Sequence, residues 1–165
     1  MLTELNQLSP YKVFRVTETE SLEHYEFISD GGIRYYIHFD ICEYFTNPQI
    51  NENSYVFSFG SFTIGQLSDT KIKLTIIEVI KYFFTVRENI LLFTCDDHDE
   101  RSLCRKKLFD RWHKEYSGNV NTTKINESVS GDDFQYHSSL IIRRDNLNYN
   151  ECIEAFKDFH SDLRK

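Results

Sequence analysis

Glycine is scarce in this chain, at 6 of 165 residues. Loops that hold phosphate use glycine so that backbone N–H groups can approach the ligand, and the sequence contains neither a P-loop nor a G-x-G-x-x-G pattern. The G-x-S-x-G turn that exposes a nucleophilic serine is also missing. The sequence therefore argues against nucleotide-binding and serine-hydrolase sites built on these loops.

Cysteine and histidine are present but lack the spacing of metal sites. The four cysteines, Cys42, Cys95, Cys104 and Cys152, are widely separated and form no C-x-x-C pair. No two histidines have the H-x-x-x-H spacing of a metal-binding helix. We therefore expect no metal site and no cofactor, and we interpret the cysteines as reduced, mostly buried thiols.

Long apolar runs and an excess of positive charge are absent as well. No run approaches the length of a membrane span, and residues 1–10 lack the apolar core of a signal peptide. The formal net charge of −7 argues against non-specific binding to nucleic acid or to an acidic membrane surface. We expect a cytoplasmic protein that binds neither nucleic acid nor membrane.

Aromatic residues are abundant, with 14 Phe and 10 Tyr. These residue types suit strands and large contacts between elements. With 40% hydrophobic and 27% charged residues, the composition is that of a soluble globular protein. We expect residues 1–165 to form a single domain in which helices pack on a sheet.

Alternation of apolar and polar residues predicts most of the strands. Residues 22–29 and 33–39 flank Asp30-Gly31-Gly32, which is a strong signal for a β-hairpin. This hairpin would place His24 and His38 opposite each other. The remaining predicted strands are residues 11–16, 55–59, 89–95 and 134–142.

Helical periodicity or capping signals predict helices over residues 71–84, 99–116 and 148–163. The first of them has Ser68 or Asp69 as its N-cap. Its many β-branched residues leave a strand as the alternative. The last has the spacing of a capping box at its start, followed by a clean amphipathic stripe.

Between the last predicted strand and the helix before it, residues 117–133 are polar, contain glycine and show no periodicity. We interpret them as a mobile loop. The element order is then β-β-β-α-β-α-β-α, and the first three strands have no helices between them, which argues against a parallel sheet. We predict an α+β fold, with an antiparallel sheet of about five or six strands and three helices packed on it.

The most informative stretch is residues 89–116, which run from the strand at residues 89–95 through an acidic turn into the helix that follows. If this helix begins near Asp99, then Arg101 and Arg105 continue the inward-facing stripe that contains Phe109 and Trp112. A guanidinium group on a core-facing stripe is costly to bury without a partner. It must therefore meet a carboxylate or an anionic ligand.

Two interpretations of this stretch remain open. Arg101 and Arg105 can form a structural network of ion pairs with Asp96 and Asp99. Alternatively, the two arginines bind a phosphate- or carboxylate-bearing ligand, which a planar guanidinium group holds through paired hydrogen bonds. The four residues are therefore our candidates for an anion-binding site or an ion-pair network.

Other chemistry at this stretch has weaker support. The acidic residues are also explained by capping of the following helix, and the pattern of a calcium-binding loop is absent. Cys95 lies near the helix start with His98 close in sequence, a setting that can activate a thiol. The neighbouring carboxylates oppose a thiolate, however, and no second basic partner is specified. We therefore assign no catalytic residue.

The segment Cys95-Asp96-x-x-Asp99-x-Arg101-x-x-x-Arg105-x-x-x-Phe109-x-x-Trp112 resembles the central signature of a family of small Bacteroidetes proteins. That family is a domain of unknown function. The similarity extends from the first hairpin to the end of the helix that contains Trp112. It implies an intracellular bacterial protein and brings no known activity, cofactor or catalytic residue.

Two hypotheses of function follow. Because no complete catalytic constellation is found and Tyr and Phe are abundant, the first is a non-enzymatic binding or protein-interaction module. Its aromatic surfaces would support association into a homo-oligomer or binding of another protein. The second is an enzyme that acts on an anionic substrate, where Arg101 and Arg105 hold the anion and Asp96, His98 or Asp99 handles protons or a metal.

Overall fold

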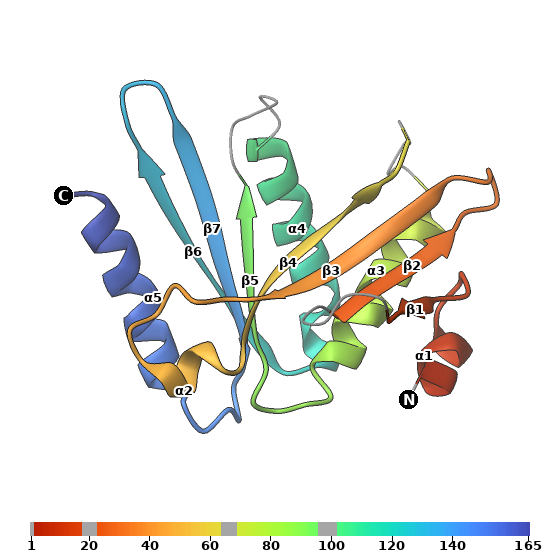
Figure 1. The fold of residues 1–165 in the computed structure, drawn as a ribbon, viewed down its shortest axis with the longest axis horizontal. Helices are drawn as coiled ribbons and strands as arrows, with labels where there is room; N and C mark the ends of the chain where they lie inside the picture. Colours follow the sequence, from red (N-terminus) through yellow and green to blue (C-terminus); the bar gives the residue numbers. More distant parts are fainter. Residues whose placement is uncertain (1, 18–22, 64–68, 96–101) are drawn as a thin grey trace. The chain divides into compact units, whose positions relative to one another are not determined.

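A computed structural model describes residues 2–17, 23–63, 69–95 and 102–165. These residues form an α+β fold with five α-helices and a seven-stranded mixed sheet, in which the strands follow the order β1-β2-β3-β4-β5-β7-β6 (Figure 1). It divides into two compact units, which are described in turn. Unit 1 comprises Met1–Asp40 and Phe57–Thr85, and unit 2 comprises Ile41–Val56 and Val86–Lys165.

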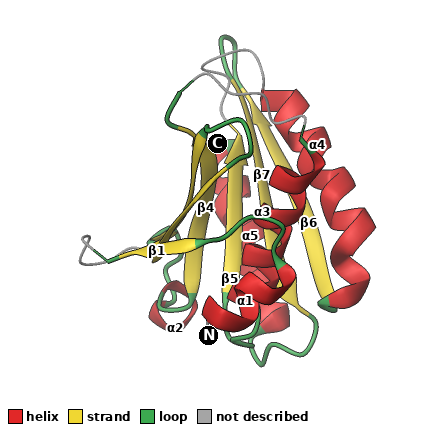
Figure 2. Ribbon diagram, turned by 90° about the vertical axis from the view of Figure 1, so that its right-hand side faces the viewer, coloured by secondary structure: helices red, strands yellow, loops and turns green. Residues whose placement is uncertain are grey.

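Each unit contains both helices and strands (Figure 2). The elements that belong wholly or mostly to unit 1 are α1 (Leu2–Leu8), β1 (Phe14–Val16), β2 (Glu23–Ile28), β3 (Arg34–Ile41), β4 (Ser54–Ser61) and α3 (Thr70–Phe83). Those of unit 2 are α2 (Pro48–Asn51), β5 (Ile90–Cys95), α4 (Ser102–Tyr116), the 3-10 turn η1 (Ser117–Asn119), β6 (Thr122–Ser130), β7 (Gln135–Arg143) and α5 (Tyr149–Leu163).

Unit 1 is organised around the predicted hairpin. β2 and β3 pair antiparallel, and alternate residues of β3 are buried as the period of two requires. Phe39 stacks on Phe83 of α3 with 4.4 Å between ring centroids. Asp69 caps α3 by accepting a hydrogen bond from the backbone N–H of Lys71 at 2.8 Å. The helix at this position and its Asp69 cap are therefore confirmed.

The expected contact between two histidines of the hairpin is also confirmed. His24 and His38 occupy partner positions on β2 and β3, and their ring centroids lie 4.1 Å apart. Burial and the neighbouring His24 lower the pKa of His38. The two rings meet edge to face, and the lowered pKa favours the neutral form of His38.

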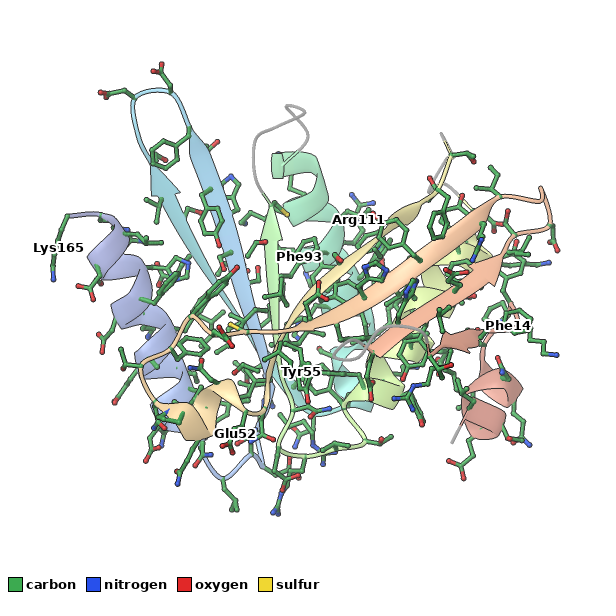
Figure 3. The ribbon with its side chains drawn as sticks, in the orientation of Figure 1. Phe14, Glu52, Tyr55, Phe93, Arg111 and Lys165 are labelled. Carbon is green, nitrogen blue, oxygen red and sulfur yellow. The ribbon has the colours of Figure 1, made fainter. Side chains whose placement is uncertain are left out.

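In unit 2 the sheet formed by β5, β7 and β6 has two faces, and a helix covers each. Leu140 and Ile142 of β7 pack on Cys152 and Phe156 of α5, within one hydrophobic cluster. On the other face Phe93 of β5, which is labelled in Figure 3, stacks on Phe109 of α4 with 4.4 Å between centroids. Side chains two residues apart on a strand lie on the same face of the sheet. Alternate residues of β5 and β7 therefore face α4, and the residues between them face α5.

Several details of the predicted fold are wrong. The three predicted helices are present as α3, α4 and α5, but α1 and α2 were not predicted. Residues 122–130, which we assigned to a loop, form β6 and pair antiparallel with β7. Among the described residues the sheet is mixed and has seven strands, rather than antiparallel with five or six.

No helix among the described residues is long and apolar enough to cross a lipid bilayer.

Candidate functional site

A pocket in unit 2 lies between α5 and residues 44–50, the segment that leads into and includes most of α2. Its volume is about 330 Å³. We call it the α2–α5 pocket. Its lining residues are Tyr44, Phe45, Thr46, Asn47, Ile50, Glu151, Glu154, Ala155, Asp158, Phe159 and Asp162.

One wall of the pocket is held in place by a short capped helix. Asn47 caps α2 by accepting a hydrogen bond from the backbone N–H of Gln49 at 3.0 Å, and Pro48 occupies the first helical position. Asn51 accepts a hydrogen bond from the backbone N–H of Phe45 at 3.0 Å. Phe45 is buried in the hydrophobic cluster of unit 2. The segment is therefore fixed from both ends before any ligand arrives.

An aromatic pair contributes to the lining. Tyr44 stacks on Phe159 of α5 with 5.4 Å between centroids and an interplanar angle of 6°. Tyr44 is 45% exposed, so part of its ring remains available to a ligand. Partial burial raises the pKa of the Tyr44 hydroxyl, which stays protonated at neutral pH.

Acidic side chains line the pocket along α5. Glu151, Glu154, Asp158 and Asp162 all belong to the lining. Residues at these helical spacings lie on neighbouring turns, so their carboxylates gather on one side. Asp162 pairs with the exposed Lys165 at 2.6 Å. Within the described part of the chain, the other three carboxylates have no ion-pair partner.

The combination of an aromatic pair with unpaired carboxylates favours a cation. The face of an aromatic ring carries partial negative charge, and it attracts a guanidinium or ammonium group placed above it. A carboxylate nearby adds a charge-assisted hydrogen bond. The α2–α5 pocket therefore has the chemistry of a site for a cationic side chain.

A second polar region lies on the opposite side of the unit-2 sheet, beneath α4. The Lys124 ammonium donates to the Asp110 carboxylate, to the amide oxygen of Asn126, and to the Ser139 hydroxyl at 3.0 Å. Asp110 also pairs with Lys106 at 3.1 Å. Burial lowers the pKa of Lys124, whose side chain is 5% exposed. Burial opposes ionisation of Asp110, but the hydrogen bonds from the two lysines hold the pKa of its carboxyl below the usual value.

This lysine network is structural in character. Each of the three donors of the Lys124 ammonium has an acceptor, and the ammonium is therefore held in its charged form. A fully hydrogen-bonded ammonium cannot act as a nucleophile. Nearby on the same face His113 bonds Thr122 at 3.0 Å, and burial lowers the pKa of His113 to about 4.

His137 of β7 is placed next to this network and is 5% exposed. Its Nδ1 atom lies 2.7 Å from the Ser128 hydroxyl on β6. Its Nε2 atom is buried and has no hydrogen-bond partner among the described residues. Cys95, the last residue of β5, is the partner position of His137 across the strand pair. A thiol, an imidazole and a hydroxyl therefore form a row across three neighbouring strands.

The residues that the sequence singled out cannot be placed in either region. Asp96, Asp99 and Arg101 lie outside the described residues, and Arg105 lies in α4 but its side chain is outside them as well. The anion site or ion-pair network built on these four residues stays a prediction. Further along α4 the expected inward stripe is confirmed at Phe109 and Trp112, which are 4% and 5% exposed, whereas Arg111 faces solvent (Figure 3).

Among the described residues there is no candidate site for metal coordination. Within the described ranges, no group of three or more His, Cys, Asp or Glu side chains has the geometry to hold a metal ion. The acidic cluster at residues 96–101 lies outside these ranges.

Sequence reasoning missed the α2–α5 pocket and the position of His137 between Cys95 and Ser128. The pocket is formed by residues 44–50 together with α5, which lies about a hundred residues later in the sequence. No local sequence pattern predicts a contact between segments so far apart. His137 had a clearer signal, because the predicted alternation of residues 134–142 places it on the face opposite Leu140 and Ile142. The sequence did not predict that Cys95 would be the partner position of His137 on the adjacent strand.

Residues 68–158, more than half of the chain, match the model of a protein family of unknown function, DUF6169. The chain belongs to this family. The expected resemblance to a domain of unknown function is thereby confirmed, and the stretch from Cys95 to Trp112 lies inside the DUF6169 segment. The match begins after the first hairpin and extends into α5, so its limits differ from those we expected. No curated protein and no solved structure matches the chain.

Proposed function

We propose that this DUF6169 protein is a non-enzymatic interaction module whose α2–α5 pocket holds an arginine side chain of a protein partner. The observation that carries the proposal is the stacked pair Tyr44 and Phe159 beside carboxylates that have no basic partner among the described residues. Arginine is the best match, because its planar guanidinium both stacks on an aromatic ring and pairs with a carboxylate through two hydrogen bonds.

Size and charge support the same occupant. A volume of about 330 Å³ is at the lower end of small-ligand pockets and suits one long side chain rather than a large cofactor. The net charge of −7 would draw a basic segment toward the protein. Such attraction weakens with salt, because exposed charges are screened over about 10 Å at 0.1 M ionic strength.

The proposal can be tested with short labelled peptides in which arginines, lysines or glutamates alternate with serine, using fluorescence anisotropy. The arginine peptide should bind most tightly and the glutamate peptide should not bind. Tyr44→Leu and Asp158→Asn should each weaken arginine binding about fivefold, because each removes roughly 1 kcal/mol of stacking or charge pairing.

A matched control separates the pocket from general attraction to a negative protein. Asp132→Asn removes the same single charge from an exposed turn between β6 and β7. It should leave binding within about a factor of two, because the charge is remote from the pocket residues and screened by solvent. Equal losses in Asp132→Asn and Asp158→Asn would contradict the proposal.

The remaining expectations stand as predictions beside this one. Self-association through aromatic surfaces and a cytoplasmic location are compatible with the module, and the thiols of Cys42 and Cys152 suit a reducing compartment. The enzyme hypothesis rests on Asp96, Asp99, Arg101 and Arg105. No observation on the described residues favours it over the interaction module.

A further inference from the structure

We infer that the partner of the α2–α5 pocket is a second copy of this chain, which docks through the basic outer face of α4 and inserts Arg111. This inference rests on the proposed function, because it names the source of the arginine that the pocket would hold. Both surfaces belong to unit 2.

The outer face of α4 carries a stripe of cations. Lys107, Arg111 and Lys114 are exposed, and Arg111 is labelled in Figure 3. On a helix with 3.6 residues per turn their directions fall within about 60° of one another, on the side away from the buried Phe109 and Trp112. No ion pair joins any of the three to another residue that the structure describes. We call these three residues the α4 stripe, whose positive charge unit 2 does not neutralise.

α5 carries a matching stripe of carboxylates, which we call the α5 stripe. Glu151, Glu154 and Asp158 are exposed and line the α2–α5 pocket. None of them forms an ion pair with a cation on residues 2–17, 23–63, 69–95 or 102–165. They lie on the side of the helix away from Cys152 and Phe156, which are buried in the hydrophobic cluster of unit 2. Negative charge without a counter-ion therefore borders the aromatic pair of the pocket.

The two stripes match when the helices of two copies run antiparallel. The cations of α4 are spaced by four residues and then by three, and the carboxylates of α5 by three and then by four. Each stripe covers about 10 Å of helix axis. The antiparallel pairs are Lys114 with Glu151, Arg111 with Glu154, and Lys107 with Asp158. A parallel arrangement would shift the middle pair out of register by one residue.

Arg111 is the member of the α4 stripe that suits the pocket. It is the only arginine of the three, and the antiparallel register places it opposite Glu154. The next residue of α5, Ala155, also lines the pocket, and its small side chain leaves room for a guanidinium group beside Tyr44 and Phe159. There the guanidinium stacks on an aromatic ring, while the lysines on either side pair with carboxylates at the rim.

The placement of the two helices makes the contact head to tail. α4 and α5 cover opposite faces of the sheet formed by β5, β7 and β6, so one copy can donate Arg111 while its own pocket accepts the Arg111 of another. A contact between unlike surfaces grows into chains, or into a ring if the rotation closes. Because it depends on one helix face and on exposed charges, we expect weak association that low salt favours.

The test follows the mass of the full chain by sedimentation velocity over a concentration series, at about 0.05 M and about 0.5 M salt. The native protein should associate at the lower salt and dissociate at the higher. Arg111→Glu should raise the concentration needed for association about tenfold or more, because it brings carboxylates together. A native chain that stays monomeric at low salt up to its solubility limit would overturn the inference.

A matched control and a charge swap identify the contact. Arg15→Glu on β1 makes the same charge reversal outside both stripes, and it should change that concentration less than about twofold. Equal losses in Arg15→Glu and Arg111→Glu would overturn the inference. Glu154→Arg alone should also prevent association, but an equimolar mixture with Arg111→Glu should associate again, since opposite charges then meet. Rescue shows that both variants fold, and two variants with native far-ultraviolet dichroism but no rescue would contradict the contact.

The arginine peptide separates this inference from the proposed function. Arg111→Glu leaves the pocket intact and should bind the peptide at least as tightly as the native chain, whose assemblies the peptide should dissociate. If the peptide binds but Arg111→Glu associates as the native chain does, the inference fails and the proposed function stands. If the peptide binds neither protein, the proposed function fails, and with it the insertion of Arg111 into the pocket.

Discussion

At the scale of single residues, unit 2 contains buried polar side chains that the hydrophobic pattern of the sequence does not predict. Lys124 is buried beneath α4, and its ammonium is stabilised by three oxygen acceptors rather than by water. Such an arrangement is costly unless complete, since an unpaired buried charge destabilises a fold by several kcal/mol. The burial of such a charged residue can be predicted only when its hydrogen-bond partners are known.

His113, in the same region, makes stability depend on pH. Burial lowers its folded pKa to about 4, whereas an unfolded histidine titrates near 6.5. As pH falls through this window the unfolded chain takes up the proton first, so the folded state loses stability. We expect a loss of about 1–2 kcal/mol between about pH 7.5 and pH 5, measured by urea unfolding. His113→Gln should remove most of this loss, and an equally steep profile in the variant would contradict the assignment.

At the scale of elements, the helices with strong periodicity and the alternating strands were predictable, and the polar elements were not. α3, α5 and the β2–β3 hairpin bury clear apolar faces. β6 was missed because the face it turns to α4 carries Thr122, Lys124 and Ser128, whose partners come from α4 and β7. Tertiary hydrogen bonds thus replace the hydrophobic signal that strand prediction requires.

The start of α5 shows the same limit and can be tested. The sequence suggests Asn148 as the cap, but Asn148 makes no side-chain capping bond. The buried Asn146 instead accepts from the backbone N–H of Asn148 at 2.8 Å and donates to the carbonyls of Arg87 and Glu88 at 3.2 Å. Asn146→Ala should therefore cost about 2 kcal/mol of unfolding free energy, because it removes three hydrogen bonds that the buried Asn146 side chain makes to the backbone. Asn148→Ala should cost less than about 0.5 kcal/mol by the same urea measurement. The reverse ranking would show that the capping box is real.

At the scale of the whole molecule, we predicted a single domain, and the structure divides into two compact units. Whether the two units unfold together can be measured. Trp112 is the only tryptophan and lies in unit 2, so its fluorescence reports that unit, whereas far-ultraviolet dichroism reports both. We predict coincident urea transitions by the two probes, as for a single cooperative domain. Separated midpoints would show that the units unfold independently and would replace the single-domain prediction. The α2–α5 pocket lies within unit 2 and should survive even then.

The order of the strands has one more consequence. β1 and β6 are the two ends of the sheet, and an open sheet edge invites another chain to add a strand. β1 offers only three residues for such docking, and β6, although nine residues long, carries the inward-pointing charge of Lys124. An incoming strand or a slip in register would have to tolerate that buried ammonium. Lys124 thus disfavours the addition of a further strand at the β6 edge.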